Sequence, residues 1–161
     1  MAIIKKPMMG FSESIETCLK KYITFSGRAR RSEYWRFYLF YIFSIFIFYI
    51  IYLAGINLII IYISSFVLYI PLLAAEVRRF HDIGYSGYWV LLPLLMNVLL
   101  KSSSDLFEII GIIIGIASIV LLCQDSQPAT NAYGPSPKYV NEDDENNQKG
   151  MPRSDEAVIE N

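Results

Sequence analysis

The chain contains an uninterrupted stretch of 39 residues, from Phe37 to Ala75, without a charged side chain. A single helix of that length would rise about 58 Å, roughly twice the thickness of the hydrocarbon core of a bilayer. The segment 54–57 contains Gly and Asn, which tolerate the left-handed backbone of a tight turn. The sequence therefore predicts two membrane-spanning helices, at about 37–54 and 58–75, that fold back on each other.

Two further apolar segments follow, at about 84–100 and 106–123, and we expect them to form a second hairpin of spans. The first of these is short for a full crossing and carries Pro93, which favours a kink. Hydrophobic residues make up 54% of the chain and the mean hydropathy is +0.38, both high for a soluble domain. The predicted fold is an all-α membrane protein with four transmembrane helices arranged as two hairpins.

An amphipathic interfacial helix is predicted at 11–25, ahead of the first span. Its apolar residues recur at spacings of three and four: Phe11, Ile15, Cys18, Leu19 and Tyr22. Two interpretations remain open for this helix. It could lie on an anionic lipid surface, because basic residues follow it, or it could pack against the membrane domain of the protein itself.

The two polar ends of the chain differ in charge. Residues 1–36 carry eight Lys or Arg against three Glu, whereas residues 126–161 carry three basic residues against seven acidic ones. We expect 1–10 to be a flexible N-terminus and 11–137 to be the membrane domain. We expect 138–161 to be a disordered acidic tail, because it has few apolar residues to pack.

Positive residues also predict the orientation, since Lys and Arg are retained on the cytoplasmic side of a membrane. They concentrate before the first span and after the second, at Arg78 and Arg79. The turn at 54–57 carries none and the turn at 101–105 carries one. With four spans, we therefore expect both termini and the central loop to be cytoplasmic.

Two polar clusters, at 25–36 and 76–89, carry the densest chemistry of the chain. Each combines an Arg pair, an acidic residue and a Tyr-Trp pair at the start of a predicted hairpin. The candidate site residues are the charged members and the one histidine: Arg28, Arg30, Arg31, Glu33, Glu76, Arg78, Arg79, His81 and Asp82. The expected interfacial anchors, at the depth of the lipid headgroups, are Tyr34, Trp35, Arg36, Tyr88 and Trp89.

Three strings stand out: GRARRSEYW at 27–35, RRFHD at 78–82 and NAYGPSP at 131–137. In this order they resemble the bacterial inner-membrane family called domain of unknown function (DUF) 805. The resemblance covers about 11–137 and implies a small multi-span helical protein of the bacterial cytoplasmic membrane. It implies no activity, because none is established for the family, and the long acidic tail departs from the family pattern.

Several uses of the clusters are open. Ion pairs among the charged residues could fix how the hairpins dock. The arginines could instead hold the phosphate of an anionic lipid headgroup, which would make the protein a membrane-embedded binding or interaction component. The alternative is a small transporter or proton-coupled permease component that uses Glu76, His81 and Asp82. If His81 instead has a structural role, we expect its imidazole to bond to Asp82, to Glu76 or to a backbone carbonyl.

Other function classes find little support in the sequence. Paired Cys or His ligands for a metal, a nucleotide-binding glycine loop and a nucleophile motif are all missing, so we expect no metal, no cofactor and no enzyme activity. Cys18 and Cys123 are interpreted as small apolar side chains. The expected partners are the lipid bilayer with its anionic headgroups, and a second copy or another membrane protein, rather than nucleic acid.

Overall fold

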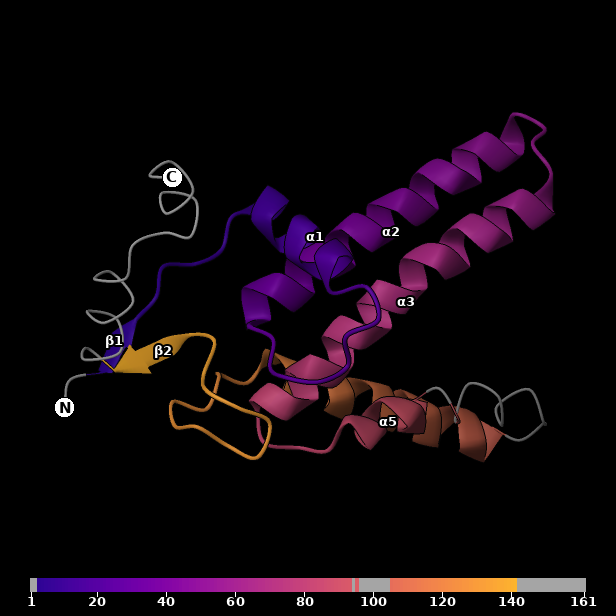
Figure 1. The fold of residues 1–161 in the computed structure, drawn as a ribbon. Helices are drawn as coiled ribbons and strands as arrows, with labels where there is room; N and C mark the ends of the chain where they lie inside the picture. The colour runs from indigo at the N-terminus through magenta and orange to yellow at the C-terminus, as the bar shows by residue number, and fades with distance from the viewer. Residues whose placement is uncertain (1–2, 94, 96–104, 142–161) are drawn as a thin grey trace, which may run out of the picture.

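The computed structural model of the chain describes residues 3–93, 95 and 105–141. Its elements are β1 (Ile3–Lys5), α1 (Phe11–Lys20), α2 (Arg31–Leu53), α3 (Leu58–Asp82), the 3-10 helix η1 (Gly87–Val90), α5 (Asp105–Cys123) and β2 (Tyr139–Asn141). The far half of the predicted span 84–100, the turn before α5 and the tail beyond β2 lie outside the described residues. Figure 1 shows a long α2–α3 hairpin with α1 beside its base and α5 below it.

The hairpin of α2 and α3 reverses where the sequence predicts it. Gly55 adopts a positive φ of 93°, and the side chain of Asn57 caps α3 by accepting a hydrogen bond from the backbone N–H of Ile59 at 2.9 Å. Both helices are longer than the predicted spans, because their charged ends stay helical. α2 begins at Arg31 rather than near 37, and α3 runs on to Asp82 rather than ending near 75.

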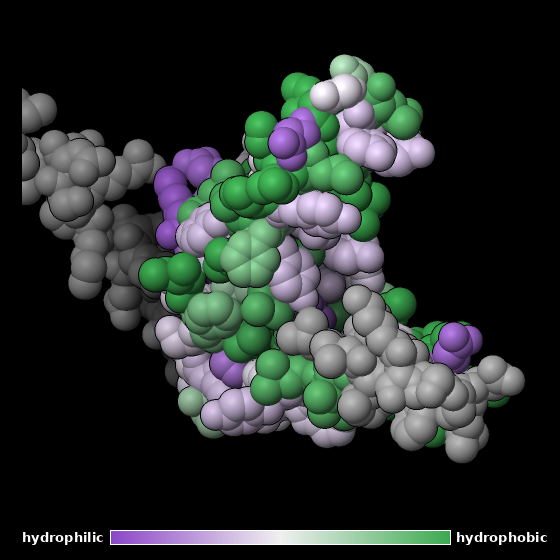
Figure 2. All heavy atoms as spheres, turned by 90° about the vertical axis from the view of Figure 1, so that its right-hand side faces the viewer, coloured by the Kyte–Doolittle hydropathy of each residue, from purple (hydrophilic) through white to green (hydrophobic). Residues whose placement is uncertain are grey.

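Helices α2 and α3 are long and apolar enough to cross a membrane. Only 11% and 22% of their most apolar windows are buried inside the molecule, whereas a core helix of a soluble protein is mostly buried. The space-filling view in Figure 2 shows apolar and aromatic side chains on the outer surface of this region. The described part of α5 from Glu108 to Cys123 is a shorter apolar helix.

The packed core lies at the base of the hairpin, away from the turn at Gly55. Its buried apolar residues come from α1, α2, α3, η1, α5 and the loop after α3: Cys18, Tyr34, Phe37, Leu72, Ala75, Phe80, Ile83, Val90 and Leu122. Beyond this core the α2–α3 hairpin and α5 diverge, as Figure 1 shows. The core therefore holds the polar clusters together at one end of the molecule.

Helix α1 packs against the membrane domain, which is one of the two interpretations left open by its sequence. Ser14 and Cys18 are fully buried, and the Cys18 thiol lies 3.9 Å from the carbonyl oxygen of Glu33 on α2. The opposite face is polar and carries an exposed ion pair between Glu16 and Lys20. The helix ends at Lys20, five residues earlier than predicted, and a turn follows it.

The two ends of the described chain pair with each other, which differs from the flexible N-terminus predicted for 1–10 and the disorder predicted from 138 onward. β1 and β2 form an antiparallel two-stranded sheet in which Ile3 lies opposite Asn141 and Lys5 lies opposite Tyr139. A further backbone hydrogen bond joins Lys6 to Lys138 at 2.9 Å. The all-α expectation missed these strands because three residues are too few to show a periodic pattern.

Candidate functional site

The first polar feature of the site is a buried carboxylate held by two arginines. Asp82, at the end of α3, is fully buried and accepts a hydrogen bond from the Nε atom of Arg28 at 2.9 Å. It also accepts one from Arg79, one turn earlier in α3. Both arginine side chains are themselves buried. This triad joins the loop before α2 to the end of α3.

A second buried ion pair joins α2 to α3. The Nη1 atom of Arg78 lies 2.6 Å from an Oε1 oxygen of Glu33, and both side chains are almost fully shielded from solvent. The Nε atom of Arg78 also donates to the carbonyl oxygen of Ala74. Removing one partner of such a pair leaves an uncompensated buried charge, which is strongly destabilising. The pair therefore fixes how the two helices dock.

Arg79 and Arg28, the two arginines that hold Asp82, also bind carbonyl oxygens at the end of α5 and in the loop that follows it. Arg79 donates to the carbonyl oxygens of Leu122 and Gln124. These carbonyls belong to the last turn of α5 or follow it, where helix carbonyls lack partners within the helix. Arg28 donates to three more loop carbonyls, those of Gln127, Ala129 and Gly134. Arg28 and Arg79 are thus occupied by structural bonds.

His81 lies on a different face of α3 from this network. Its Nδ1 atom is 3.1 Å from the carbonyl oxygen of Gly27, and its ring stacks on Tyr133 with centroids 3.8 Å apart. The backbone oxygen of His81 accepts a hydrogen bond from Asn131 at 2.9 Å. Three distant sequence strings therefore meet around this ring. Of the partners proposed for His81, the structure selects a backbone carbonyl.

Glu76, His81 and Asp82 do not come together as a relay. Asp82 is fully ion-paired, and His81 bonds to Gly27. The carboxylate of Glu76 has no hydrogen bond or ion pair with another residue in the described parts of the chain. Since five residues of helix turn the chain by about 140°, Glu76 and His81 also project from different faces of α3.

The predicted anchors fall into two groups. Tyr34 is buried in the core, where its ring contacts Trp35 edge-on at 5.2 Å. Tyr88 and Trp89 are exposed on η1. Arg36 donates to the sulfur atom of Met8 at 3.3 Å.

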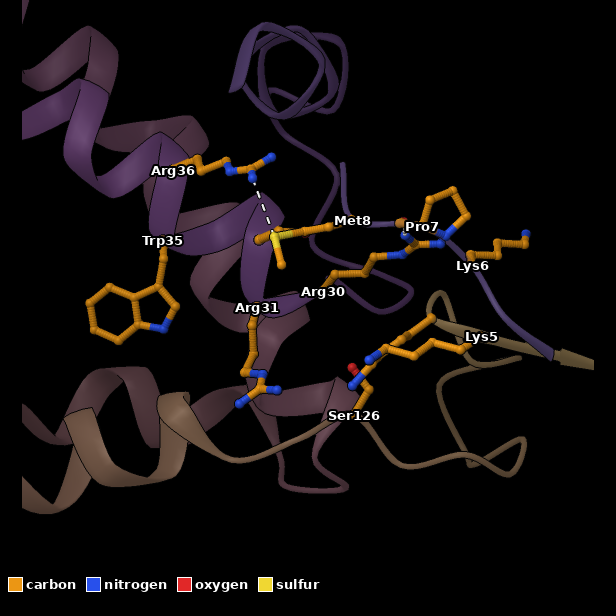
Figure 3. Close-up of a pocket in the computed structure, with 11 residues that line it drawn as sticks. Lys5, Lys6, Pro7, Met8, Arg30, Arg31, Trp35, Arg36 and Ser126 are labelled. Atoms are coloured by element: carbon orange, nitrogen blue, oxygen red, sulfur yellow. Dashed lines mark hydrogen bonds between the residues drawn. The ribbon is translucent and has the colours of Figure 1, made fainter. Parts of the chain in front are cut away.

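A basic pocket lies at the start of α2, between the β1–β2 sheet and the loop after α5 (Figure 3). It has a volume of about 340 Å³ and is lined by Lys5, Lys6, Pro7, Met8, Arg30, Arg31, Ser32, Trp35, Arg36, Ser126 and Lys138. Six of these residues are Lys or Arg, and none is acidic. Figure 3 shows Trp35 and Arg31 projecting from the same end of α2, and Ser126 on the loop after α5.

Two donors at this pocket are buried without a partner in the described structure: the Nη1 atom of Arg36 and the hydroxyl of Ser126. Ser126 is only 4% exposed. The start of α2 adds further donors, because no side chain caps it at Arg30 and the first N–H groups of a helix lack partners within the helix. Buried donors without acceptors are costly, so the pocket favours an anionic occupant.

The carboxylate of Asp125 adjoins the pocket without lining it. Asp125 pairs with Lys138 and, at 3.3 Å, with Arg31. Partial burial disfavours its charge, but the bonds from Lys138 and from the backbone N–H of Ser126, with the charge of Arg31, lower its pKa to about 2. The pKa of Arg30 is lowered by burial, which is opposed by the charges of nearby acids. Asp125 therefore stays ionised at neutral pH.

The sequence anticipated part of this pocket. Arg30 and Arg31 were candidate site residues, and both line it, whereas Arg36 was expected only to anchor a span. Lys5, Lys6, Ser126 and Lys138 were missed. Their recruitment depends on the pairing of the chain ends, and the Lys5–Lys6 pair in an otherwise apolar start is the one signal that pointed to them.

Comparisons with known proteins identify the family and relatives in the inner membrane. The sequence model of the family described as "Protein of unknown function (DUF805)" matches residues 22–135. The inner membrane protein YhaI of Escherichia coli (strain K12) is 34% identical over 124 residues, which cover 75% of this chain and 92% of the relative. The inner membrane protein YhaH of the same strain is 35% identical over 126 residues, which cover 74% and 92%. No solved structure matches the chain.

Proposed function

Because this chain belongs to the DUF805 family and is similar to inner membrane proteins, we propose that it is a membrane-embedded binding protein whose basic pocket holds an anionic lipid headgroup. One observation carries the proposal. Arg36 and Ser126 line the pocket, and the Nη1 atom of Arg36 and the hydroxyl of Ser126 are buried without an acceptor among the described residues. A phosphate oxygen is the acceptor that such a cluster of cations and donors recognises.

The depth of the pocket favours a lipid as the source of that phosphate. Trp35 lines the pocket, and the uncharged stretch of α2 begins two residues later at Phe37. Trp and basic side chains at the end of an apolar helix are typical of the headgroup region. An anion bound there would remain attached to acyl chains that run beside α2.

We further propose four spans with both termini in the cytoplasm. The β1–β2 sheet brings the two ends of the described chain together, which is compatible with an even number of crossings. Arg79 at the end of α3 donates to the carbonyl oxygen of Leu122 at the end of α5, so these two helix ends lie at the same end of the molecule. The excess of Lys and Arg at that end favours the cytoplasmic side.

This proposal divides the candidate arginines into two classes. Arg28, Arg78 and Arg79 are buried in ion pairs and caps, and they stabilise the junction of the helices. Arg30, Arg31 and Arg36 line the pocket with three lysines, and their positive charges act on a ligand there even where part of their hydrogen bonding is already made. The headgroup site therefore lies beside the buried network and not within it.

Lipid retention tests the proposal. The protein is purified from bacterial membranes in mild detergent, and the anionic phospholipid bound per protein is measured for the wild type and for a Lys5→Gln/Lys6→Gln variant. Both lysines lie outside the buried network, so the variant should remain folded and should lose most of the retained anionic lipid. Lys20→Gln, which removes an exposed charge on α1, is the matched control and should retain it. Equal retention in all three proteins would overturn the proposal.

A further inference from the structure

We infer that the ligand of the basic pocket carries a terminal phosphate, as a phosphomonoester does, rather than the internal phosphate of a phosphodiester. This inference rests on the proposed function and specifies the chemistry of the same site. It follows from the charge of the pocket and from the number of separate elements that supply its donors.

The charge of the pocket exceeds what a phosphodiester neutralises. Six basic side chains line it, and the adjoining carboxylate of Asp125 is shared between Arg31 and Lys138. Basic residues therefore outnumber acidic ones around the cavity, even when Glu13 and Glu33, whose charges act on Arg30, are counted. A phosphodiester brings one negative charge, whereas a phosphomonoester brings up to two near neutral pH. The basic side chains of the pocket repel one another. A ligand with two negative charges relieves more of this repulsion than a ligand with one.

Some of these cations act through charge alone, because their hydrogen bonds are already made. The Nε atom of Arg30 donates to the carbonyl oxygen of Pro137 at 2.5 Å, and its Nη1 atom donates to that of Pro7 at 2.7 Å. Arg31 similarly donates to the carbonyl oxygen of Cys123 at 3.1 Å. These bonds fix two guanidinium groups in the wall of the pocket.

The donors without an acceptor among the described residues belong to three separate elements. Arg36 and the uncapped first turn lie on α2, Ser126 lies in the loop after α5, and Lys5 and Lys6 extend from β1. A phosphomonoester presents three terminal oxygens that accept strong hydrogen bonds, as many as there are elements that supply donors. A phosphodiester has only two such oxygens and leaves one group of donors without an acceptor. The arrangement therefore matches a terminal phosphate.

The pH dependence of binding distinguishes the two classes of ligand. The second pKa of a phosphomonoester is about 6, so the dianionic fraction rises about tenfold between pH 5 and pH 7.5, whereas a phosphodiester keeps one charge throughout. The pocket lining contains no histidine, and Asp125 stays ionised in this range because its pKa is about 2. The pKa of Lys138 is raised: partial burial opposes its charge, but the bond to Asp125 outweighs that effect. The ligand is therefore the group expected to titrate.

The experiment uses the full chain in nanodiscs of neutral lipid containing either phosphatidic acid, a phosphomonoester, or phosphatidylglycerol, a phosphodiester. Binding is measured at pH 5 and at pH 7.5. We expect the affinity for phosphatidic acid to rise about tenfold with pH and to exceed that for phosphatidylglycerol at pH 7.5. The Lys5→Gln/Lys6→Gln variant should lose this preference, and Lys20→Gln should keep it.

The other outcomes are separable. Equal and pH-independent affinity for both lipids would overturn the inference and leave the proposed function intact. Binding of neither lipid would overturn both. A third arm adds soluble glycerol phosphate as a competitor. Displacement of phosphatidic acid at similar concentrations would support the phosphomonoester chemistry but overturn a lipid as its source, and failure to displace it supports the lipid.

Discussion

The Nε atom of Arg28 lies 2.9 Å from the Oδ1 oxygen of Asp82, and both side chains are buried. The two residues are 54 positions apart in the sequence. Their pairing joins the loop that leads into α2 to the last turn of α3. The same carboxylate also holds Arg79, so one acidic group balances two buried cations.

Replacing Asp82 should destabilise the protein more than any other single change in the network. Asp82→Asn leaves Arg28 and Arg79 without a countercharge in a buried site, which costs about 3–5 kcal/mol of unfolding free energy. Unfolding by denaturant in mixed micelles measures the change. Asp125→Asn is the matched control, because its half-exposed ion pairs contribute only about 0–1 kcal/mol. A similar, small effect of both substitutions would show that the buried triad is not what holds α3 in place.

Gly87 is predicted to be intolerant of any side chain. A Cβ atom there would lie 2.7 Å from a methyl carbon of Val77 and 2.9 Å from the Nε2 atom of His81. Gly87→Ala should therefore lower the free energy of unfolding by about 1–3 kcal/mol through overpacking. Gly115→Ala in α5 is the control, since nothing lies within 4 Å of its Cβ position, and it should be neutral or stabilising. Equal behaviour of the two variants in thermal unfolding contradicts this packing.

The two cysteines should differ in reactivity. Burial raises the pKa of the Cys18 thiol to about 12, with a further contribution from the charge of Glu33, whereas Cys123 is exposed. The thiolate is the reactive form, so a maleimide should label the folded, detergent-solubilised protein once and the denatured protein twice. Mass spectrometry counts the labels and locates them. Rapid labelling of Cys18 in the folded protein would be incompatible with the packing of α1 on α2.

The contribution of Asp125 to the free energy of unfolding should be lost only in strong acid. Its pKa is lowered from 3.8 to about 2 in the folded protein, so its stabilising effect is fully present above about pH 4 and is lost as the pH falls to about 2. The difference in unfolding free energy between the wild type and Asp125→Asn should be constant from pH 7 to pH 5 and should vanish near pH 2. A difference that disappears already near pH 5 would contradict the lowered pKa.

The hairpin could be predicted from the sequence because its causes are local. The uncharged stretch gives the length of the two helices, and Gly55 with Asn57 gives the turn. The helix ends could not be predicted in the same way. Charged residues near Arg31 and Asp82 normally end a span, but here they remain helical because the tertiary structure supplies their partners.

The composition of the pocket could not be predicted, because it depends on contacts between distant parts of the chain. Arg30 and Lys5 become neighbours in one pocket only after β1 pairs with β2, and Ser126 reaches it only after Arg79 fixes the end of α5. The sequence likewise could not separate arginines that are consumed by ion pairs from arginines that face a ligand. Burial and pairing, which distinguish them, are properties of the folded chain.

The most direct test of the central claim is the number of anionic lipids bound to the delipidated, intact protein, measured by native mass spectrometry during a lipid titration. A pocket at the start of α2 predicts one discrete adduct that forms with anionic lipid and not with neutral lipid. That adduct should disappear in a Lys5→Gln/Lys6→Gln/Arg36→Gln variant that remains folded. A gradual series of adducts, equal for anionic and neutral lipids and unchanged in the variant, would contradict a specific headgroup site.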